Sequence, residues 1–395
     1  MLCAPLTYGE ALETNDKLSI AILSGIAGNF SENQSPAQDV NKSGRPDVSE
    51  EIFHLISNSQ RELAERIQTI LTYLLLAVSL PLTICNVVVF LQKNMRSATG
   101  TYVISLSSAQ VFYLLIGSVF FVLEAVVEDR FNNFWYWAFY LYFPAYLGVV
   151  ARRGSYLVMC LVSADRLNAV ARPLHVQTFW LSKYPVRSMA VAFLVTALWH
   201  SYLLTRTKIV KLWDEKREIH VYKPIRTDLY LRNKELNDGF SLGAKIVLSY
   251  ITLAMQIVLN VLTIWALRRH SMATKHVQTS ANENKQRQKE RALTVTILAS
   301  TICYVTLSLP YAVHYLVYSL SPEYLGRYSN LYQVMTSLTY NLTLFGCGID
   351  FVCFLTLSTS YRKTFLEVFS RFREWTKIKR ETEQETWADN VSRDS

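Results

Sequence analysis

Seven long apolar blocks, separated by polar stretches, dominate the amino-acid sequence. They cover residues 67–91, 101–127, 135–162, 186–204, 242–267, 292–318 and 331–357. Each block is long enough to cross a hydrocarbon core of roughly 30 Å as a helix. Only helices and closed barrels satisfy the backbone in lipid, and the blocks lack the alternation of barrel strands. The sequence therefore predicts an all-α membrane protein, a seven-transmembrane helix bundle.

Composition agrees with a lipid environment and argues against several other classes. Hydrophobic residues make up 51% of the chain and charged residues only 18%. The net charge of +9 comes mainly from block edges and the carboxyl-terminal part, not from one continuous stripe, so we expect no nucleic-acid partner. The sequence has no glycine-rich phosphate loop, His-Glu-x-x-His motif or nucleophile elbow, and its histidines are scattered. We therefore predict no enzyme activity, no cofactor and no protein-held catalytic metal.

Cysteine positions predict no disulfide framework. Of the six cysteines, only Cys3 lies outside the apolar blocks, so no extracellular pair is available.

The polar segments indicate how the chain is oriented. Residues 1–66 are predicted to be an extracellular, largely disordered tail, with glycosylation sequons at Asn29, Asn33 and Asn41. The alternative is that these three sequons occur by chance in a polar segment and do not indicate its side of the membrane. The predicted cytoplasmic loops are rich in Lys and Arg, although the loop 205–241 on the other side is also basic. We expect a multipass plasma-membrane protein with its N-terminus outside and its C-terminus in the cytoplasm.

Residues 358–375 directly follow the seventh apolar block. Tyr361, Phe365 and Phe369 recur at helical spacing with basic residues between them. This pattern predicts a short amphipathic interfacial helix, with a plain cytoplasmic helix as the alternative. The charged residues 376–395 are predicted to be a disordered cytoplasmic tail.

A charged motif stands at the end of the third block, where residues 164–174 read Ala-Asp-Arg-Leu-Asn-Ala-Val-Ala-Arg-Pro-Leu. It resembles the Asp-Arg-Tyr signature of rhodopsin-like (class A) G-protein-coupled receptors. Residues 143–146, 151–155 and 258–269 are similar to the third and fifth helices of invertebrate FMRFamide-type neuropeptide receptors. The resemblance covers about residues 67–375, so 67–357 would form the seven-transmembrane receptor domain.

This resemblance implies a receptor that binds an extracellular ligand, in the first place a short neuropeptide, and signals through a heterotrimeric G protein. A chemosensory receptor for a small molecule is the alternative within that class. A multipass transporter is the alternative from another class, although the sequence shows no internal repeat.

The resemblance also implies roles for particular residues. G-protein coupling and activation would involve Asp165, Arg166, Glu290, Asn260, Pro310, Asp350 and Phe354. Glu290 would hold Arg166 in the resting state. A polar core would combine Asn86, Gln110 and Asp350, with the usual acid and amide of the second and seventh helices exchanged, and a sodium ion is a candidate occupant beside Gln110 and Asp350.

Glu124, Arg152 and Tyr311 are the candidate ligand-pocket residues. Buried charges in a membrane are costly and therefore candidates for function. Arg152 and Arg153 are adjacent, so their side chains point about 100° apart and at most one faces the bundle centre. The alternative role for Arg152 is structural, a pair inside the bundle with Asp350 or with a backbone carbonyl.

Some positions depart from the family pattern. Leu141 stands where a cysteine is usual, and the loop 205–241 lacks its partner. Ser308 replaces the tryptophan of the sixth helix, and Asp-Phe-Val-Cys-Phe at 350–354 replaces Asn-Pro-x-x-Tyr. Trp199 is the candidate for the tryptophan of the fourth helix.

Overall fold

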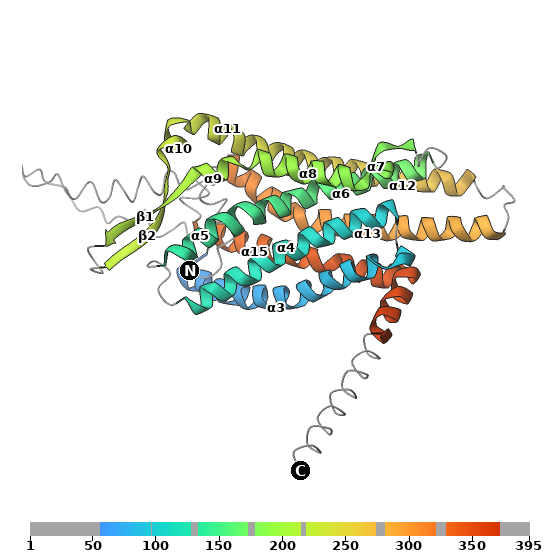
Figure 1. The fold of residues 1–395 in the computed structure, drawn as a ribbon, viewed down its shortest axis with the longest axis horizontal. Helices are drawn as coiled ribbons and strands as arrows, with labels where there is room; N and C mark the ends of the chain where they lie inside the picture. Colours follow the sequence, from blue (N-terminus) through green and yellow to red (C-terminus); the bar gives the residue numbers. More distant parts are fainter. Residues whose placement is uncertain are drawn as a thin grey trace, which may run out of the picture.

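The computed structural model describes residues 56–95, 97–127, 133–172, 178–214, 219–273, 281–320 and 329–371; it leaves out the side chains of 58, 214, 270–273, 281–290 and 319. Seven helices in this part of the chain are long and apolar enough to cross a membrane. The predicted seven-span bundle is therefore confirmed. Figure 1 shows the spans running side by side along the long axis of the molecule.

Several spans are built from more than one helical segment. In chain order they are α3 (Asn58–Phe90), α4 (Ala98–Val126), α5 (Phe134–Tyr142) with η4 (Phe143–Gly148) and α6 (Val149–Ala171), α8 (Pro185–Trp199) with α9 (Tyr202–Arg206), α11 (Lys234–Lys245) with η6 (Ile246–Ile251) and α12 (Thr252–Ala273), α13 (Ala281–Leu320), and α15 (Ser329–Leu357). The segments η4 and η6 are π-helical turns, which often occur at functional sites. Short helices η2 (Lys93–Met95), α7 (Trp180–Lys183) and α10 (Asp228–Arg232) lie in connections.

The first span begins at Asn58, well before the apolar block at 67. Ser57 caps it: the Ser57 hydroxyl accepts from the Gln60 backbone N–H, and the Gln60 side chain accepts from the Ser57 N–H. Such a reciprocal capping box is a strong helix start. The first turns carry polar residues, so hydrophobicity alone placed the start too late. For the same reason the third span extends beyond 162, to Ala171.

A β-hairpin interrupts the otherwise helical fold, which the all-α prediction did not include. Strands β1 (Thr207–Asp214) and β2 (Ile219–Arg226) pair antiparallel, with Thr207 opposite Arg226. Ring contact between Phe134 and Tyr222, at 5.8 Å between centroids, joins the hairpin to the start of α5. We call this end of the bundle the hairpin end, and the opposite end the Arg166 end (Figure 1).

Polar bonds and close packing join the first and last spans. Asn341 on α15 accepts from the Thr72 hydroxyl at 2.6 Å and donates to the Gln68 carbonyl at 3.2 Å. Farther along, a Cβ on Gly348 would lie 3.1 Å from the Ser79 hydroxyl, so glycine permits the close approach. The span ending in α6 is the most buried of the seven, which places its side chains where they contact several helices.

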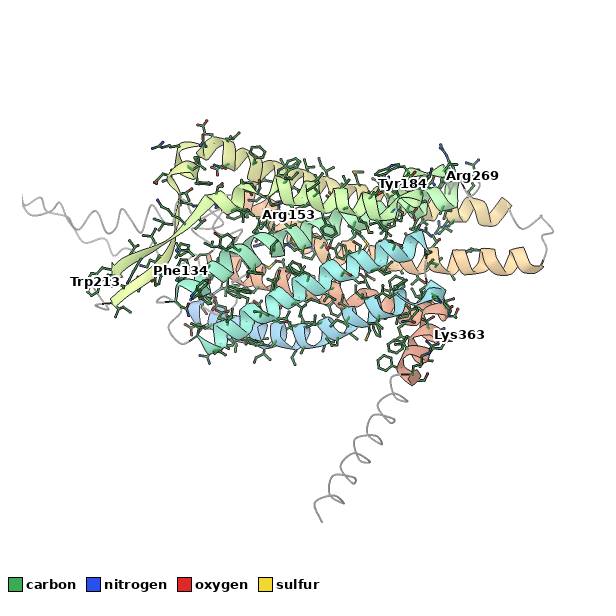
Figure 2. All side chains as sticks on the ribbon, viewed as in Figure 1. Phe134, Arg153, Tyr184, Trp213, Arg269 and Lys363 are labelled. Atoms are coloured by element: carbon green, nitrogen blue, oxygen red, sulfur yellow. The ribbon has the colours of Figure 1, made fainter. Side chains whose placement is uncertain are left out.

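A short helix covering 359–371 follows α15 and turns away from the bundle at the Arg166 end (Figure 1). Its Tyr361 is fully buried, whereas Leu366 and Phe369 are exposed. Lys363 lies on this helix in Figure 2. Residues 372–375 of the predicted interfacial helix, the tail 376–395, and the sequons at Asn29, Asn33 and Asn41 lie outside the described residues.

Candidate functional site

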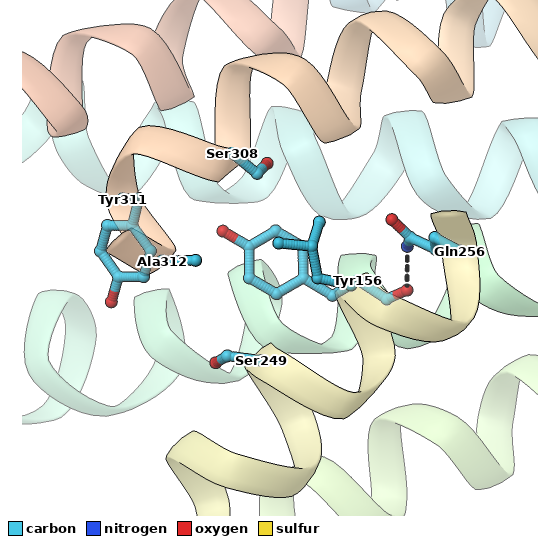
Figure 3. Close-up of a pocket in the computed structure, with 7 residues that line it drawn as sticks. Tyr156, Ser249, Gln256, Ser308, Tyr311 and Ala312 are labelled. Carbon is cyan, nitrogen blue, oxygen red and sulfur yellow. Dashed lines mark hydrogen bonds between the residues drawn. The ribbon is translucent and has the colours of Figure 1, made fainter. Parts of the chain in front are cut away.

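A small cavity lies between three spans near Pro310 (Figure 3). Its walls are Tyr156 of α6; Ser249, Leu253 and Gln256 of the fifth span; and Ser308, Tyr311 and Ala312 of α13. Its volume of about 10 Å³ has room for one water molecule. Any larger ligand must therefore displace side chains. Ser308, which replaces the expected tryptophan, leaves a hydroxyl in this wall.

Gln256 links the fifth span to α6 at the cavity. Its Nε2 donates to the Tyr156 backbone carbonyl at 2.9 Å, the dashed line in Figure 3. Gln256 is 1% exposed, and its Oε1 has no hydrogen-bond donor among the residues described. The sequence reading missed Gln256, although a polar residue within an apolar block was the signal that could have identified it.

Arg152 contacts the sixth span beside the cavity. Its Nη2 donates to the Tyr311 hydroxyl at 3.0 Å, and its Cζ lies 4.6 Å from the centre of the Tyr311 ring. The alternative pair between Arg152 and Asp350 does not form: the Asp350 carboxylate instead accepts from Gln110 and Ser300. The structure thus brings two of the three candidate pocket residues together.

Glu124, the third candidate, is buried near the end of α4, whereas the cavity walls come from α6, the fifth span and α13. Glu124 is therefore not among the residues that line this cavity, and its part in ligand binding stays a prediction.

Arg153 points to a different helix from Arg152, as the helical period requires. Its Nη1 lies 2.8 Å from His200 Nε2 on the fourth span, and His200 Nδ1 lies 2.7 Å from the Thr196 carbonyl. A carbonyl only accepts and a guanidinium only donates, so His200 carries its proton on Nδ1 and accepts at Nε2. The imidazole is therefore neutral. Figure 2 shows Arg153 among the helices, away from both ends.

Aromatic rings continue from the cavity toward the hairpin end. The Tyr311 and Tyr315 rings lie 4.5 Å apart, and His314 contacts both Tyr315 and Tyr332. His314 Nε2 also lies 2.9 Å from the Thr336 hydroxyl on α15. These contacts hold α13 and α15 against each other beside the cavity, in the parts of both helices nearer the hairpin end.

The predicted polar-core residues make two separate sets of bonds. Gln110 Nε2 donates to Asp350 Oδ2 at 3.2 Å, and the Ser300 hydroxyl also donates to Asp350. Asn86 instead accepts from the Tyr361 hydroxyl at 2.6 Å. Among the described residues Asn86 therefore bonds to Tyr361 and not directly to Gln110 or Asp350, and a polar core that includes all three stays a prediction. Tyr361 was not identified as a polar partner, because it lies beyond the seventh span.

The Asp350 carboxylate and the buried Oε1 of Gln110 are oxygen ligands of the type that hard cations take. These residues therefore fit the suggested sodium ion, which would add positive charge beside Asp350.

At the Arg166 end, the Asp165 carboxylate is the shared partner of several side chains. Arg166 Nη2 lies 2.6 Å from Asp165 Oδ2, and the Ser182 hydroxyl donates to Asp165 Oδ1 at 2.5 Å. Thr99 Oγ1 lies 3.5 Å from the same carboxylate. The side chain of Glu290 lies outside the described residues, so its pairing with Arg166 stays a prediction.

Three other predicted activation residues lie on the fifth, sixth and seventh spans. Asn260 Oδ1 accepts from the Thr301 hydroxyl at 3.0 Å, which joins the fifth and sixth spans. Pro310 lies inside α13, where proline leaves a backbone carbonyl without its usual partner. Phe354 is buried, with its ring 4.9 Å from Phe90 and 5.6 Å from Tyr361.

Trp199, the candidate tryptophan of the fourth helix, ends α8 and donates from Nε1 to the Phe240 carbonyl at 3.1 Å. On the same helix Phe193 packs against Gly154 of α6, where an added Cβ would lie 2.3 Å from the Phe193 ring.

Residues 70–372 match the family model of the serpentine type seven-transmembrane G-protein-coupled receptor chemoreceptors, Srw. The chain belongs to the Srw family. It is also 24% identical over 312 residues to a probable G-protein-coupled receptor of Caenorhabditis elegans, an alignment that covers 75% of this chain and 68% of that protein.

Membership in the Srw family makes this protein a G-protein-coupled receptor for an extracellular ligand and places it outside the enzyme classes. The Srw family is a chemoreceptor family. The comparisons therefore support the receptor class but not the narrower neuropeptide reading.

Proposed function

We propose that this Srw protein is a plasma-membrane chemoreceptor that binds a small extracellular molecule between its helices and activates a heterotrimeric G protein. The observation that carries the proposal is the cavity shared by α6, the fifth span and α13, with Arg152 and Tyr311 in contact at its edge. Small-molecule sites are usually concave with a few converging polar groups, and at about 10 Å³ this cavity would have to widen to admit such a ligand.

In this proposal the hairpin end faces outward and the Arg166 end faces the cytoplasm. The basic residues of the 268–291 loop favour that orientation. A ligand would then enter past Tyr315 and Tyr332 and reach the cavity beside Pro310.

Ligand binding must favour one arrangement of the helices over another if it is to produce a signal. A molecule larger than the cavity separates α13 from α6 and the fifth span. The same three spans meet again at Asn260, Thr301 and Ser163, nearer to Arg166. Movement of α13 about Pro310 would alter those bonds and open the Arg166 end to a G protein.

The test is a signalling screen in cells that express the full-length receptor with promiscuous G-protein α subunits. Small organic molecules form one arm, and short amidated peptides form the other. The expected result is a second-messenger response to a small molecule that disappears in Arg166→Ala at matched surface expression.

Two results would replace the proposal. A response only to amidated peptides would establish the neuropeptide reading. Uptake of a labelled compound without any second-messenger response would establish a transporter.

A further inference from the structure

We infer that Gln256 is the residue that selects the ligand of this receptor: its Oε1 accepts a hydrogen bond from the hydroxyl of an uncharged, otherwise apolar small molecule. This inference rests on the proposed function, because it names the class of ligand for the same cavity.

The Gln256 amide has a fixed orientation. Its nitrogen donates to the Tyr156 backbone carbonyl at 2.9 Å (Figure 3). A backbone carbonyl only accepts hydrogen bonds, so the amide atom that faces it is Nε2 and the other atom is the oxygen. That oxygen is buried, and it has no hydrogen-bond donor among the residues that the structure describes. Gln256 is therefore able to accept a bond from a molecule in the cavity.

A second glutamine shows what separates a packing contact from a binding site. Gln68 on α3 donates from Nε2 to the Val334 carbonyl at 3.1 Å, and its Oε1 is also buried without a donor among the described residues. The two amides therefore make the same kind of contact between helices. Of the two, only Gln256 lines the cavity. The cavity, together with the amide, makes Gln256 a residue that can recognise a ligand.

The size of the cavity matches one hydroxyl group. At about 10 Å³ it has room for a single group of the size of water. A ligand hydroxyl in that position donates to Gln256 Oε1 and can accept from the Ser249 or Ser308 hydroxyl of the same wall. Ser249 lies in the π-helical turn η6, and Ser308 lies two residues before Pro310. The rest of the ligand requires the widening of the cavity described above.

The wall of the cavity favours an uncharged ligand. The seven residues that line it are all uncharged. An ammonium group would meet no carboxylate in this wall, and burying a charge without a partner is costly. A carboxylate would place oxygens that only accept against the Gln256 oxygen, which also only accepts. Leu253 and Ala312 add apolar surface to the wall, which suits a hydrocarbon body.

Thermal stability of the purified full-length receptor in detergent measures binding without requiring signalling. The probes are benzyl alcohol, 2-phenylethanol and 1-octanol, each compared with its methyl ether. Phenylacetate and 2-phenylethylamine are the charged counterparts of 2-phenylethanol. We expect at least one alcohol to raise the melting temperature. Its ether should need a concentration about 10- to 100-fold higher, because the ether leaves the buried Gln256 oxygen unsatisfied. The inference is overturned if no alcohol stabilises the receptor, or if the ether, the acid or the amine does so equally well.

Matched variants of the two glutamines assign the preference to the site. Gln256→Met keeps the length of the side chain but removes the acceptor, so the preference for alcohol over ether should disappear. Gln68→Met is the control and should keep the wild-type preference. A merely structural Gln256 would lower the melting temperature of the ligand-free receptor and leave the preference intact, and that result would refute the assignment. Gln256→Leu replaces Gln256→Met if the latter does not fold, and the comparison of alcohol with ether on the wild type needs neither variant.

The signalling screen separates this inference from the proposed function. Alcohol binding that depends on Gln256 but produces no G-protein response would leave this inference standing and refute the proposed function. A G-protein response confined to small molecules without a hydroxyl or N–H donor would do the reverse. A response to amidated peptides alone would overturn both.

Discussion

Gln110 on α4 donates from Nε2 to Asp350 Oδ2 on α15 at 3.2 Å, so an amide and a carboxylate from distant parts of the chain form a direct bond between two spans. The Ser300 hydroxyl from α13 also donates to Asp350. One carboxylate thereby connects three helices, and any shift of α13 relative to α15 must change its bonds.

The first prediction tests this pair by exchange. Asp350→Asn should reduce agonist-stimulated signalling about tenfold, because the carboxylate that receives both bonds is lost. Adding Gln110→Asp should restore part of the response, since it returns one acid and one amide to the same place. Contacting residues typically show coupling of about 0.5–3 kcal/mol. Strictly additive effects at matched surface expression would contradict direct coupling.

A second prediction concerns the Tyr361 hydroxyl, which lies 2.6 Å from Asn86 Oδ1. Burial raises the pKa of the Tyr361 phenol, so it stays protonated and can donate. Tyr361→Phe keeps the ring contacts with Phe354 but leaves the Asn86 carbonyl unsatisfied. We expect a loss of about 1–3 kcal/mol in the free energy of unfolding, measured in detergent. Tyr142→Phe is the control, and an equal loss there would argue against the bond.

The third prediction follows from the packing of Gly154 against Phe193. Gly154→Ala would place a Cβ 2.3 Å from the Phe193 ring, so either that ring or helix α8 must shift. Overpacking of this kind costs about 1–3 kcal/mol. Phe193→Leu in the same chain should recover much of the melting temperature. Gly239→Ala, where nothing lies within 4 Å, should change it little, and failure of the rescue would mean that the clash is not the cause.

The fourth prediction separates the two adjacent arginines. His200→Phe removes the acceptor for Arg153, so the buried guanidinium loses a charge-assisted bond worth about 1.5–3 kcal/mol. Arg153→Met combined with His200→Phe should be more stable than His200→Phe alone, because both polar partners are then replaced. The melting temperatures of the wild type, the two single variants and the double variant decide this. A double variant no better than the single one would contradict the pairing.

The fifth prediction concerns the resting state at the Arg166 end. Asp165→Asn should raise basal signalling several-fold, because it weakens the bonds to Arg166 and Ser182. Glu290→Gln should also raise it if Glu290 holds Arg166, as the motif resemblance implies. Basal second-messenger levels at equal surface expression test each change separately. An unchanged baseline in Glu290→Gln would leave Asp165 as the residue that restrains Arg166.

Local sequence patterns were sufficient to predict that the seven spans exist but not to predict the residues at which they begin and end. The seven blocks followed from apolar length alone, whereas the start at Asn58 depended on the Ser57 capping box. The hairpin at 207–226 was missed because its basic residues were interpreted as a charged loop. Strand pairing depends on a partner segment, which the charge of a single stretch does not reveal.

The sequence by itself determined that this is a seven-span membrane protein and placed an Asp-Arg motif at the end of the third span, because lipid demands long apolar helices and that requirement is local in the chain. The tertiary structure decided that Arg152 meets Tyr311 while Arg153 meets His200, and that Asn86 bonds to Tyr361 and not directly to Gln110 or Asp350. Those choices depend on the rotation and depth of each helix against its neighbours. Packing between segments far apart in the sequence sets both, so no local pattern contains them.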